Sequence, residues 1–282
     1  PHFNACGGKA QCSTCRVMLA EGAKNVTPAG DKERALRTRI TCSPNIRLAC
    51  QTYVTGSTVQ VHRIIRDPTD VFLYIGEPAD ADDRQELGEE RELALFFLDI
   101  RDFTPFMEAS LPFDVMHVIR RMFRIFKRVI EEFDGTIIET AGDGLYAVFG
   151  LKTNLTDAAR SAVKAGQGLL LEVDSFSRTY LQPYFNVSFQ LGIGLHCGKV
   201  IIGHRVTGLN NNMTVMGLPV NIASRLQNAS KNLNNSFIVS DAVFRLLDAP
   251  TVTPTRNISL KGVHDGYLVH LMGNSYEGIV DN

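Results

Sequence analysis

The cysteines of this 282-residue chain are unevenly distributed, and their spacing is typical of a metal site. Five of the six lie in the first 50 residues: Cys6, Cys12 and Cys15 share a loop rich in glycine, serine and threonine, and 34 residues separate Cys15 from Cys50. Four thiolates in such a loop, with backbone N–H groups around them, can hold an iron–sulfur cluster. Zinc is the alternative, although structural zinc sites usually pair two short Cys-x2-Cys knuckles and this sequence has one. A disulfide scaffold would spread its cysteines over a shorter chain.

Two aspartates occupy positions where neighbouring strands are expected to end. Asp99 follows the apolar run Leu93–Leu98, and Asp143 lies between Gly142 and Gly144 at the tip of an expected hairpin. Because acids at the ends of neighbouring strands can come close together, this pair predicts a hard-oxygen site for two Mg²⁺ or Mn²⁺ ions. Such ions can activate an attacking oxygen and neutralise a leaving phosphate. Taken singly, each acid also suits a turn or a helix N-cap.

Polar groups suited to a phosphorylated sugar occur at two further places. Asn221 and Arg225 are four residues apart in an expected helix and therefore share one face of it. An amide and a guanidinium that project together suit a sugar oxygen and a phosphoryl group. The backbone N–H groups from Ile100 through Phe103 to Thr104 lie at a strand-to-helix junction, where they can bind phosphate oxygens.

The elements that position these residues follow from hydrophobic periodicity and turn residues. Residues 1–66 form one block and residues 67–91, rich in carboxylates, an expected connector; residues 92–273 form a second block, and 274–282 a tail. In the first block we expect strands at 16–19 and 58–64 and a helix at 31–39. In the second we expect helices at 112–133, 157–173 and from 219, and strands at 93–98, 136–139, 145–149, 187–195, 200–202, 237–239, 258–260 and 268–271. Strands and helices without strict alternation predict an α+β fold.

The composition, 44% hydrophobic with a net charge of −1, is typical of a globular protein of two domains. The near-zero charge argues against binding to nucleic acid, so the basic residues of the helix at 112–133 predict a solvated or partner-binding face. The longest apolar run, Leu93–Leu98, is far shorter than the roughly 20 residues that span a bilayer. With no visible signal peptide, we expect a cytoplasmic protein. Because the chain starts with Pro1, we expect a fragment, and an upstream membrane anchor stays open.

Three motifs of the second block together resemble the class III nucleotide cyclase domain: the run from Phe97 to Thr104, the Gly142–Gly144 hairpin tip and the helix start at Val220–Leu226. The resemblance covers about residues 90–272. It implies a ferredoxin-like (βαββαβ) domain. It also implies an enzyme in which the ribose 3′-oxygen of a nucleoside triphosphate attacks the α-phosphate and pyrophosphate leaves.

The same resemblance assigns roles to the residues of these motifs. Asp99, Asp143 and the carbonyl of Ile100 would bind the two metal ions. Asn221 would orient the ribose, and Arg225 would stabilise the pentacoordinate phosphorus. These half-sites would face each other only in a head-to-tail homodimer, in which each site takes its metals from one chain and Asn221 and Arg225 from the other.

The residues expected to read the base form a mixed pair. Glu139, four residues before Asp143, stands where adenylate cyclases have lysine, and its carboxylate can accept from guanine N1–H and N2–H₂. Thr214 resembles bacterial adenylate cyclases, although its hydroxyl can also donate to guanine O6. The choice between ATP and GTP therefore stays open, with GTP slightly favoured. Lys261 is expected to contact the triphosphate or to be solvated. Leu218, where the family usually has aspartate, is expected to reduce activity without abolishing it.

With the Arg47–Gln51 segment included, residues 1 to about 66 closely resemble a [2Fe–2S] ferredoxin of the β-grasp type, with adrenodoxin-like cysteine spacing. The resemblance implies cluster ligation by Cys6, Cys12, Cys15 and Cys50. The family has two strands before the first ligand, so the β-grasp sheet is expected to be incomplete here. Cys42 has no ligand counterpart, and we expect it to be a small buried residue.

The leading interpretation is a nucleotide cyclase regulated by a [2Fe–2S] domain, with a redox partner protein as the expected reductant. One alternative is a degenerate cyclase domain that dimerises and binds nucleotide without turning it over. The other is a ferredoxin electron carrier whose cyclase domain only docks a reductase. A turnover assay with Mn²⁺ distinguishes the first alternative from an active cyclase. The cyclase rate measured before and after reduction of the cluster distinguishes the second alternative from a regulated cyclase. His196 and Cys197 are expected to be structural.

Overall fold

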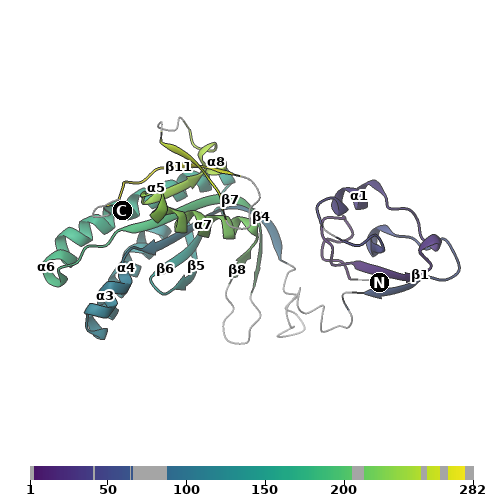
Figure 1. The fold of residues 1–282 in the computed structure, drawn as a ribbon, viewed down its shortest axis with the longest axis horizontal. Helices are drawn as coiled ribbons and strands as arrows, with labels where there is room; N and C mark the ends of the chain where they lie inside the picture. Colours follow the sequence, from purple (N-terminus) through teal and green to yellow (C-terminus); the bar gives the residue numbers. More distant parts are fainter. Residues whose placement is uncertain are drawn as a thin grey trace. The chain divides into compact units, whose positions relative to one another are not determined.

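The structure is a computed structural model that describes residues 3–40, 42–63, 65, 88–204, 213–248, 253–260 and 266–276. The chain divides into two compact units whose main boundary lies between Gly88 and Glu89 (Figure 1). Most of the connector expected at 67–91 lies outside the described residues. Its last part does not continue as a linker, because Glu89–Arg91 already belong to a strand.

The N-terminal unit is built on a small antiparallel sheet. β1 (Arg16–Glu21) lies between β2 (Ile46–Leu48) and β3 (Gln60–Arg63). The only α-helix described in this unit is α1 (Asp31–Arg37), and two short 3₁₀ turns, η1 (Ala23–Asn25) and η2 (Ala49–Gln51), complete it. Its small core contains Cys15, Leu36 and Leu48. The strands and helix expected for this block are confirmed, each within a few residues.

A buried ion pair connects α1 to β2. Arg47 donates from Nε to Glu33 Oε1 and from Nη2 to Glu33 Oε2, both at 2.9 Å. The Leu48 N–H also donates to Glu33 Oε1, at 2.9 Å, and Arg47 Nη1 donates to the Thr27 carbonyl at 2.8 Å. Because Glu33 is fully buried, these bonds compensate a desolvated carboxylate. They also fix the strand that leads directly to Cys50.

The C-terminal unit contains a mixed sheet of eight strands in the order β10-β11-β9-β7-β4-β6-β5, with β8 paired to β7. The strands are β4 (Glu89–Ile100), β5 (Gly135–Ala141), β6 (Gly144–Phe149), β7 (Leu191–His204), β8 (Met213–Met216), β9 (Phe237–Ser240), β10 (Thr255–Ile258) and β11 (Tyr267–Leu271). β7 and β9 run parallel, while β4 pairs antiparallel with both β6 and β7. The expected α+β class is therefore confirmed.

Helices cover both faces of this sheet (Figure 1). They are α3 (Phe103–Ala109), α4 (Pro112–Glu132), α5 (Leu155–Phe176), a π-helical turn η3 (Ser177–Leu181), α6 (Gln182–Phe185), α7 (Leu218–Asn232) and α8 (Asp241–Phe244). Leu98 and Ile100 pack with α4 and α5, whereas Leu95 lies in the cluster that contains Ala223 of α7. Since side chains alternate along a strand, α4 and α5 cover one face and α7 the other.

Three expected strand segments differ from the structure. The strand expected at 187–195 begins later, at Leu191, and it continues through 200–202 as one strand, β7, because Gly198 stays in register with Leu93 of β4. The strand expected at 258–260 lies earlier, at Thr255–Ile258, where it pairs with β11. The hairpin at Asp143 and the helix at 112–133 are confirmed.

The Glu33–Arg47 pair predicts a pH-dependent stability of the N-terminal unit. Burial raises the pKa of Glu33, but the hydrogen bonds from Arg47 and Leu48 lower it by more than burial raises it. The pKa of Glu33 therefore lies below its ordinary value of 4.5. A lowered folded-state pKa adds stability above the unfolded-state value, and this stability is lost as the pH falls through the folded-state value. Glu33→Gln leaves Arg47 buried without a counter-charge and is expected to destabilise the unit by about 3–5 kcal/mol at pH 7.

The measurement is hydrogen exchange of the backbone amides of the N-terminal unit in the full chain, at neutral pH and at pH values from 5 downwards. Asp31→Asn on the same helix is the control, because the Asp31–Arg34 pair is exposed. Equal protection in the Gln variant and the wild type at neutral pH would contradict the assigned role.

Candidate functional site

The ends of β4 and β6 bring Asp99 and Asp143 together. Leu98 pairs with Leu145, so the Gly142–Gly144 turn lies beside the end of β4. A Cβ on Gly144 would lie 2.9 Å from the Leu98 carbonyl and 3.3 Å from Asp99 Oδ1, so glycine is needed for this close approach. Burial raises the pKa of Asp99, the neighbouring charge of Asp143 raises it further, and Arg101 opposes both. The expected carboxylate pair is therefore formed.

A cavity of about 290 Å³ contains both carboxylates. Its wall includes the 100–105 segment, Gln190, Lys231 and Tyr276. The ring of Phe103 is buried against Phe106 and Phe189, so only the backbone of Phe103 is available to a ligand, while Thr104 is exposed. The Ile100 side chain is also buried, which leaves its carbonyl as the possible ligand atom.

The donor set of this cavity fits Mg²⁺ or Mn²⁺. Among the described residues, neither the Asp99 nor the Asp143 carboxylate accepts a hydrogen bond, and the charge of Asp143 adds to the effect of burial in raising the pKa of Asp99. Among all residues that the structure describes, no group of three or more His, Cys, Asp or Glu side chains is arranged as a metal site. Two carboxylates and a carbonyl are nevertheless typical of Mg²⁺ sites that are completed by water and substrate phosphates.

A bulge in β5 determines where Glu139 lies. The register of β5 against β6 shifts between Ile137 and Glu139, which brings Glu139 opposite Tyr146. Tyr146 packs on the α7 face of the sheet, where its ring stacks on Phe97 at 4.6 Å. Since opposite residues of an antiparallel pair project to the same face, Glu139 shares the face of Asp99. It is exposed there.

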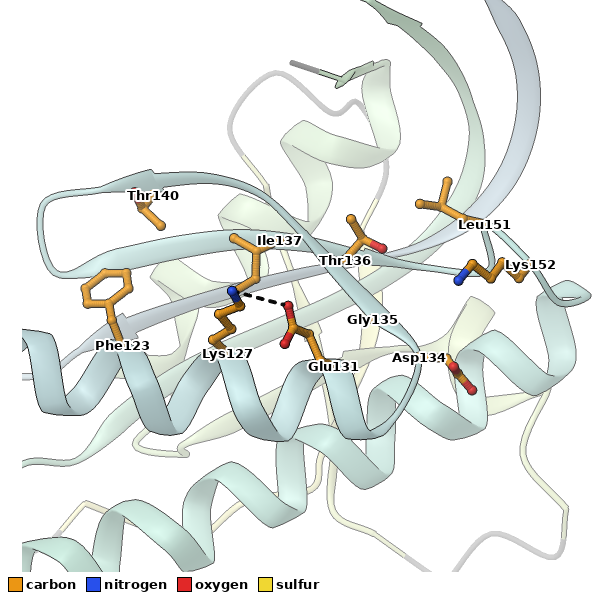
Figure 2. A pocket seen from close by; sticks show the side chains of 10 residues that line it. All are labelled: Phe123, Lys127, Glu131, Asp134, Gly135, Thr136, Ile137, Thr140, Leu151 and Lys152. Atoms are coloured by element: carbon orange, nitrogen blue, oxygen red, sulfur yellow. Dashed lines mark ion pairs between the residues drawn. The ribbon is translucent and has the colours of Figure 1, made fainter. Parts of the chain in front are cut away.

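The other face of β5 borders a second cavity, of about 610 Å³ (Figure 2). Figure 2 shows Ile137 and Thr140 of β5 on one side and Lys127 and Glu131 of α4 on the other, with the two charged groups 3.8 Å apart. None of the residues predicted to act on a nucleotide lines this cavity. Its volume is about twice that of the cavity at Asp99 and Asp143, but it contains none of the predicted metal ligands.

The helix α7 presents the other predicted catalytic groups. Asn221 is exposed and Arg225 half-buried. Arg225 Nη1 is buried and has no hydrogen-bond partner among the described residues, and the same holds for the Tyr146 hydroxyl. Neither Asn221 nor Arg225 lines the cavity of Asp99 and Asp143. Asn221 and Arg225 thus do not meet the carboxylate pair in one cavity of this chain.

The remaining predicted nucleotide residues are less informative. Thr214 is half-buried in β8, between Met213 and Val215, which pack into the core beneath α7. Alternation therefore places Thr214 on the opposite face of β8. Lys261 lies outside the described residues. Leu218 is 57% exposed at the start of α7, next to Met216 at 58%.

The four predicted cysteine ligands form two pairs, and the two side chains of each pair are in contact. Cys15 Sγ and Cys50 Sγ are 3.4 Å apart, and Cys6 is hydrogen-bonded to the side chain of Cys12. Gly7, Gly8 and Ala10 have positive φ angles of 62°, 81° and 57°, so the loop between Cys6 and Cys12 is tightly curled. Burial raises the pKa of Cys6, but backbone N–H groups of Gln11, Cys12 and Lys9 and the Cys12 side chain outweigh it, so the pKa falls to about 7. At Cys15, by contrast, burial raises the pKa to about 11, so of the two the thiolate is favoured at Cys6.

Cys42, Cys197 and His196 do not join either site. Cys42 is half-buried, so the expectation of a buried residue is wrong for it. Cys197 is buried, and burial, with a smaller effect of Glu92, raises its pKa to about 11. His196 is buried with Nδ1 at 2.9 Å from Ser240 Oγ, and burial lowers its pKa to about 4, which keeps it neutral. Both fit the expected structural roles.

The basic face of α4 is largely engaged within the chain. Arg128 pairs with Glu172 at 2.9 Å, Lys127 with Glu131 at 3.8 Å, and the Arg121 guanidinium lies 4.4 Å from the Tyr180 ring centroid. Within the described ranges, none of the helices combines the length and apolar character needed to cross a bilayer.

Among the residues of the cavity wall, Arg101, Gln190, Lys231 and Tyr276 were not identified from the sequence. Arg101 lies in the cavity wall and contacts both Asp99 and α7. A Cβ on Gly192, which pairs with Asp99 in the sheet, would clash with the Arg101 guanidinium. The sequence shows that Arg101 directly follows Ile100. Its partners on α7, Gln227 and Ser230, are 126 and 129 residues further along the chain, so no local pattern indicates them.

Comparisons with known proteins agree with this geometry. The adenylate and guanylate cyclase catalytic domain matches residues 86–273, and the 2Fe-2S iron-sulfur cluster binding domain matches residues 2–55. Adenylate cyclase 1 of Rhizobium meliloti (strain 1021) is 30% identical over 156 residues, which are 54% of this chain and 23% of that protein. Receptor-type guanylate cyclase gcy-6 of Caenorhabditis elegans is 29% identical over 171 residues, which are 58% of this chain and 15% of that protein. The chain thus matches less than a quarter of either relative.

Solved structures share the fold of the C-terminal unit. The guanylyl cyclase Cya2 superposes with a TM-score of 0.60 at 25% identity, over 68% of this chain and 96% of that one. The adenylyl cyclase CyaB from P. aeruginosa gives 0.62 at 19% identity, over 68% and 99%. Because the catalytic-domain model matches two thirds of its length, the chain belongs to the family of the adenylate and guanylate cyclase catalytic domain, preceded by a 2Fe-2S cluster binding domain.

Proposed function

We propose that the chain converts a purine nucleoside triphosphate into its 3′,5′-cyclic monophosphate and pyrophosphate, and that its [2Fe–2S] domain regulates this reaction. The observation that supports the proposal most is the carboxylate pair of Asp99 and Asp143, which opens into a cavity on the sheet face that also carries Glu139. The names of the relatives, adenylate and guanylate cyclases, point to the same chemistry.

Within the site, each group has one task. Asp99, Asp143 and the Ile100 carbonyl would hold two divalent cations. When bound, these cations supply positive charge to the triphosphate and favour ionisation of the attacking hydroxyl. The ribose 3′-oxygen forms the new bond to the α-phosphorus, the bond from that phosphorus to the bridging oxygen breaks, and the hydroxyl proton passes to solvent. Arg225 offsets the charge that develops at the phosphoryl group, and Asn221 holds the ribose.

A second copy of the chain is needed to complete this site. Asn221 and Arg225 are absent from the cavity of the carboxylates, and Arg225 Nη1 lacks a partner among the described residues. Met216 and Leu218, at the junction of β8 and α7, expose more than half of their surface to solvent. Exposed apolar side chains are enriched on surfaces that are covered in an assembly. We therefore place two shared sites in a homodimer.

The base is read by Glu139 and Thr214. A carboxylate accepts hydrogen bonds and cannot donate them, so Glu139 favours the N1–H and N2–H₂ groups of guanine over adenine N1. Thr214 is compatible with either base. GTP is therefore the favoured substrate, and ATP the alternative.

The cluster would be held by two cysteine pairs, Cys6 with Cys12 and Cys15 with Cys50. Gln51 Nε2 donates to the Gly8 carbonyl at 2.7 Å, which ties the Cys50 segment to the loop. This arrangement supports an iron–sulfur cluster better than zinc, because it has one Cys-x2-Cys knuckle and a loop curled around the first ligand. Attachment of this domain to a cyclase within one chain is the basis for proposing redox regulation in signal transduction, with the cluster reduced by a partner protein.

Glu139→Lys is expected to move the substrate preference from GTP toward ATP. An ammonium donates where the carboxylate accepts, and a polar group left unpaired when the bound base covers it changes discrimination by about 5- to 150-fold. The measurement is kcat/KM for both nucleotides, with product identity from chromatography. Glu131→Lys on α4, outside the site, is the control. A wild type that strongly prefers ATP, together with an unchanged variant, would show that position 139 does not read the base.

Asp143→Ala and Arg225→Ala are each expected to be nearly inactive, whereas their mixture should recover activity. A mixed dimer has one site with both lesions and one with neither. Random pairing makes about half of the dimers mixed, so about a quarter of the wild-type rate is the ceiling. Subunit exchange is checked with two affinity tags. If tagged mixed dimers form and remain inactive, both groups act within one chain.

Protein purified without oxygen is expected to be brown and to contain iron and acid-labile sulfide. Cys6→Ser should lose the cluster, and Cys42→Ser is the matched control that should keep it. The cyclase rate of the same preparation, oxidised and then reduced, tests the regulation. Stoichiometric zinc without sulfide would exclude the cluster, and an equal rate in both redox states would favour an electron carrier.

A further inference from the structure

Arg101 occupies a position that the proposed reaction does not require. It follows Ile100 at the end of β4, and its side chain is only 15% exposed. Its Nη1 lies 3.8 Å from Asp99 Oδ2, which is an ion pair but too long for a hydrogen bond. The guanidinium therefore neutralises part of the Asp99 charge without fixing the carboxylate.

The strong hydrogen bonds of Arg101 go to the C-terminal part of α7. Nη2 donates to the Gln227 carbonyl at 3.1 Å and to Ser230 Oγ at 2.7 Å. Ser230 is fully buried and donates in turn to the Gln227 carbonyl at 2.6 Å. The Tyr276 hydroxyl also donates to Ser230 Oγ, at 3.1 Å, and the Tyr276 ring centroid lies 5.9 Å from the guanidinium. α7 and Tyr276 thus hold Arg101 in place, independently of Asp99.

The two ends of α7 face different sites. Lys231, near its C-terminus, lines the cavity of Asp99 and Asp143 in the same chain. Asn221 and Arg225 lie toward its N-terminus and, on the proposed function, complete the site of the other subunit. Asn221 and Gln227 are six residues apart, which is about 9 Å along a rigid helix. A displacement at one end of α7 therefore reaches the other.

We propose that Arg101 is a positioning residue that couples the two active sites of the dimer: it senses the charge at Asp99 of its own metal half-site and, through Gln227 and Ser230, sets the position of α7 for the site of the partner subunit. The inference rests on the shared-site dimer. It assigns two separable effects to one side chain. Its charge weakens cation binding in its own chain, and its bonds to α7 support turnover in the opposite site.

Mixed dimers with a single live site separate the two effects. The first chain carries Arg225→Ala and supplies the carboxylates; the second carries Asp143→Ala and supplies α7. Arg101→Gln added to the second chain should lower kcat of the live site about tenfold and leave the Mn²⁺ half-saturation unchanged. Arg101→Gln added to the first chain should instead strengthen Mn²⁺ binding, by about threefold or more, with a smaller effect on kcat.

Two further variants identify the route. Ser230→Ala keeps the charge of Arg101 but removes its anchor, so in the second chain it should lower kcat without tightening Mn²⁺. Arg91→Gln, on the same strand but paired with Glu89 at 3.8 Å, is the matched control and should have neither effect. Electron paramagnetic resonance of free Mn²⁺, without nucleotide, supplies the affinity of the Arg101→Gln homodimer independently of activity.

Each outcome decides a different point. Equal losses of kcat from Arg101→Gln in either chain would show a general structural role and overturn the coupling. Unchanged Mn²⁺ binding in the homodimer would overturn the electrostatic part. The parent mixed dimer tests the shared site itself: if it is inactive, the proposed function fails in its dimeric form and the cross-dimer route fails with it. If the parent is active and the variants behave like it, only the coupling is overturned.

Discussion

The pairing of β4 with β7 determines most of what the C-terminal unit can do. Every residue of β4 is in register with β7, from Glu89 opposite Ile202 to Ile100 opposite Leu191. Because this register has no bulge, side chains alternate strictly along β4. Leu98 and Ile100 therefore enter the core under α4 and α5, while Phe97 and Asp99 face the side of α7. A shift of one residue would bury the Asp99 carboxylate in an aromatic core. The position of the carboxylate pair is therefore a consequence of a hydrophobic packing requirement.

The charged residues of the molecule illustrate two different ways of treating a desolvated carboxylate. Glu33 is fully buried and receives three hydrogen bonds from Arg47 and Leu48, which make it a permanent part of the N-terminal unit. Asp99 receives no hydrogen bond from the described residues, and the guanidinium that opposes its charge lies 3.8 Å away. The first arrangement is saturated and rigid; the second has unused acceptor capacity, which is what a site for an incoming cation needs.

Much of the fold and of the site followed from local sequence patterns. The apolar run before Asp99, the glycines around Asp143 and the amphipathic helix at 112–133 each carry their signal within a few residues, and all three are confirmed. The bulge beside Ile138 was not predictable, because a single extra residue leaves no mark in the hydrophobic pattern, yet it decides which face Glu139 occupies. The continuity of β7 through Gly198 was missed because glycine usually interrupts a strand. The partners of Arg101 depend on tertiary contacts that no local pattern encodes.

Gly192 and Arg101 have an evolutionary consequence. The guanidinium of Arg101 fills the space that a side chain at position 192 would need, so the two side chains cannot occupy this space at the same time. An alanine at 192 would displace the arginine, whereas loss of the arginine would leave a hole that a larger residue at 192 could fill. A lineage that accepts a side chain at 192 therefore has to move or lose the Arg101 guanidinium, which gives up its bonds to Gln227 and Ser230.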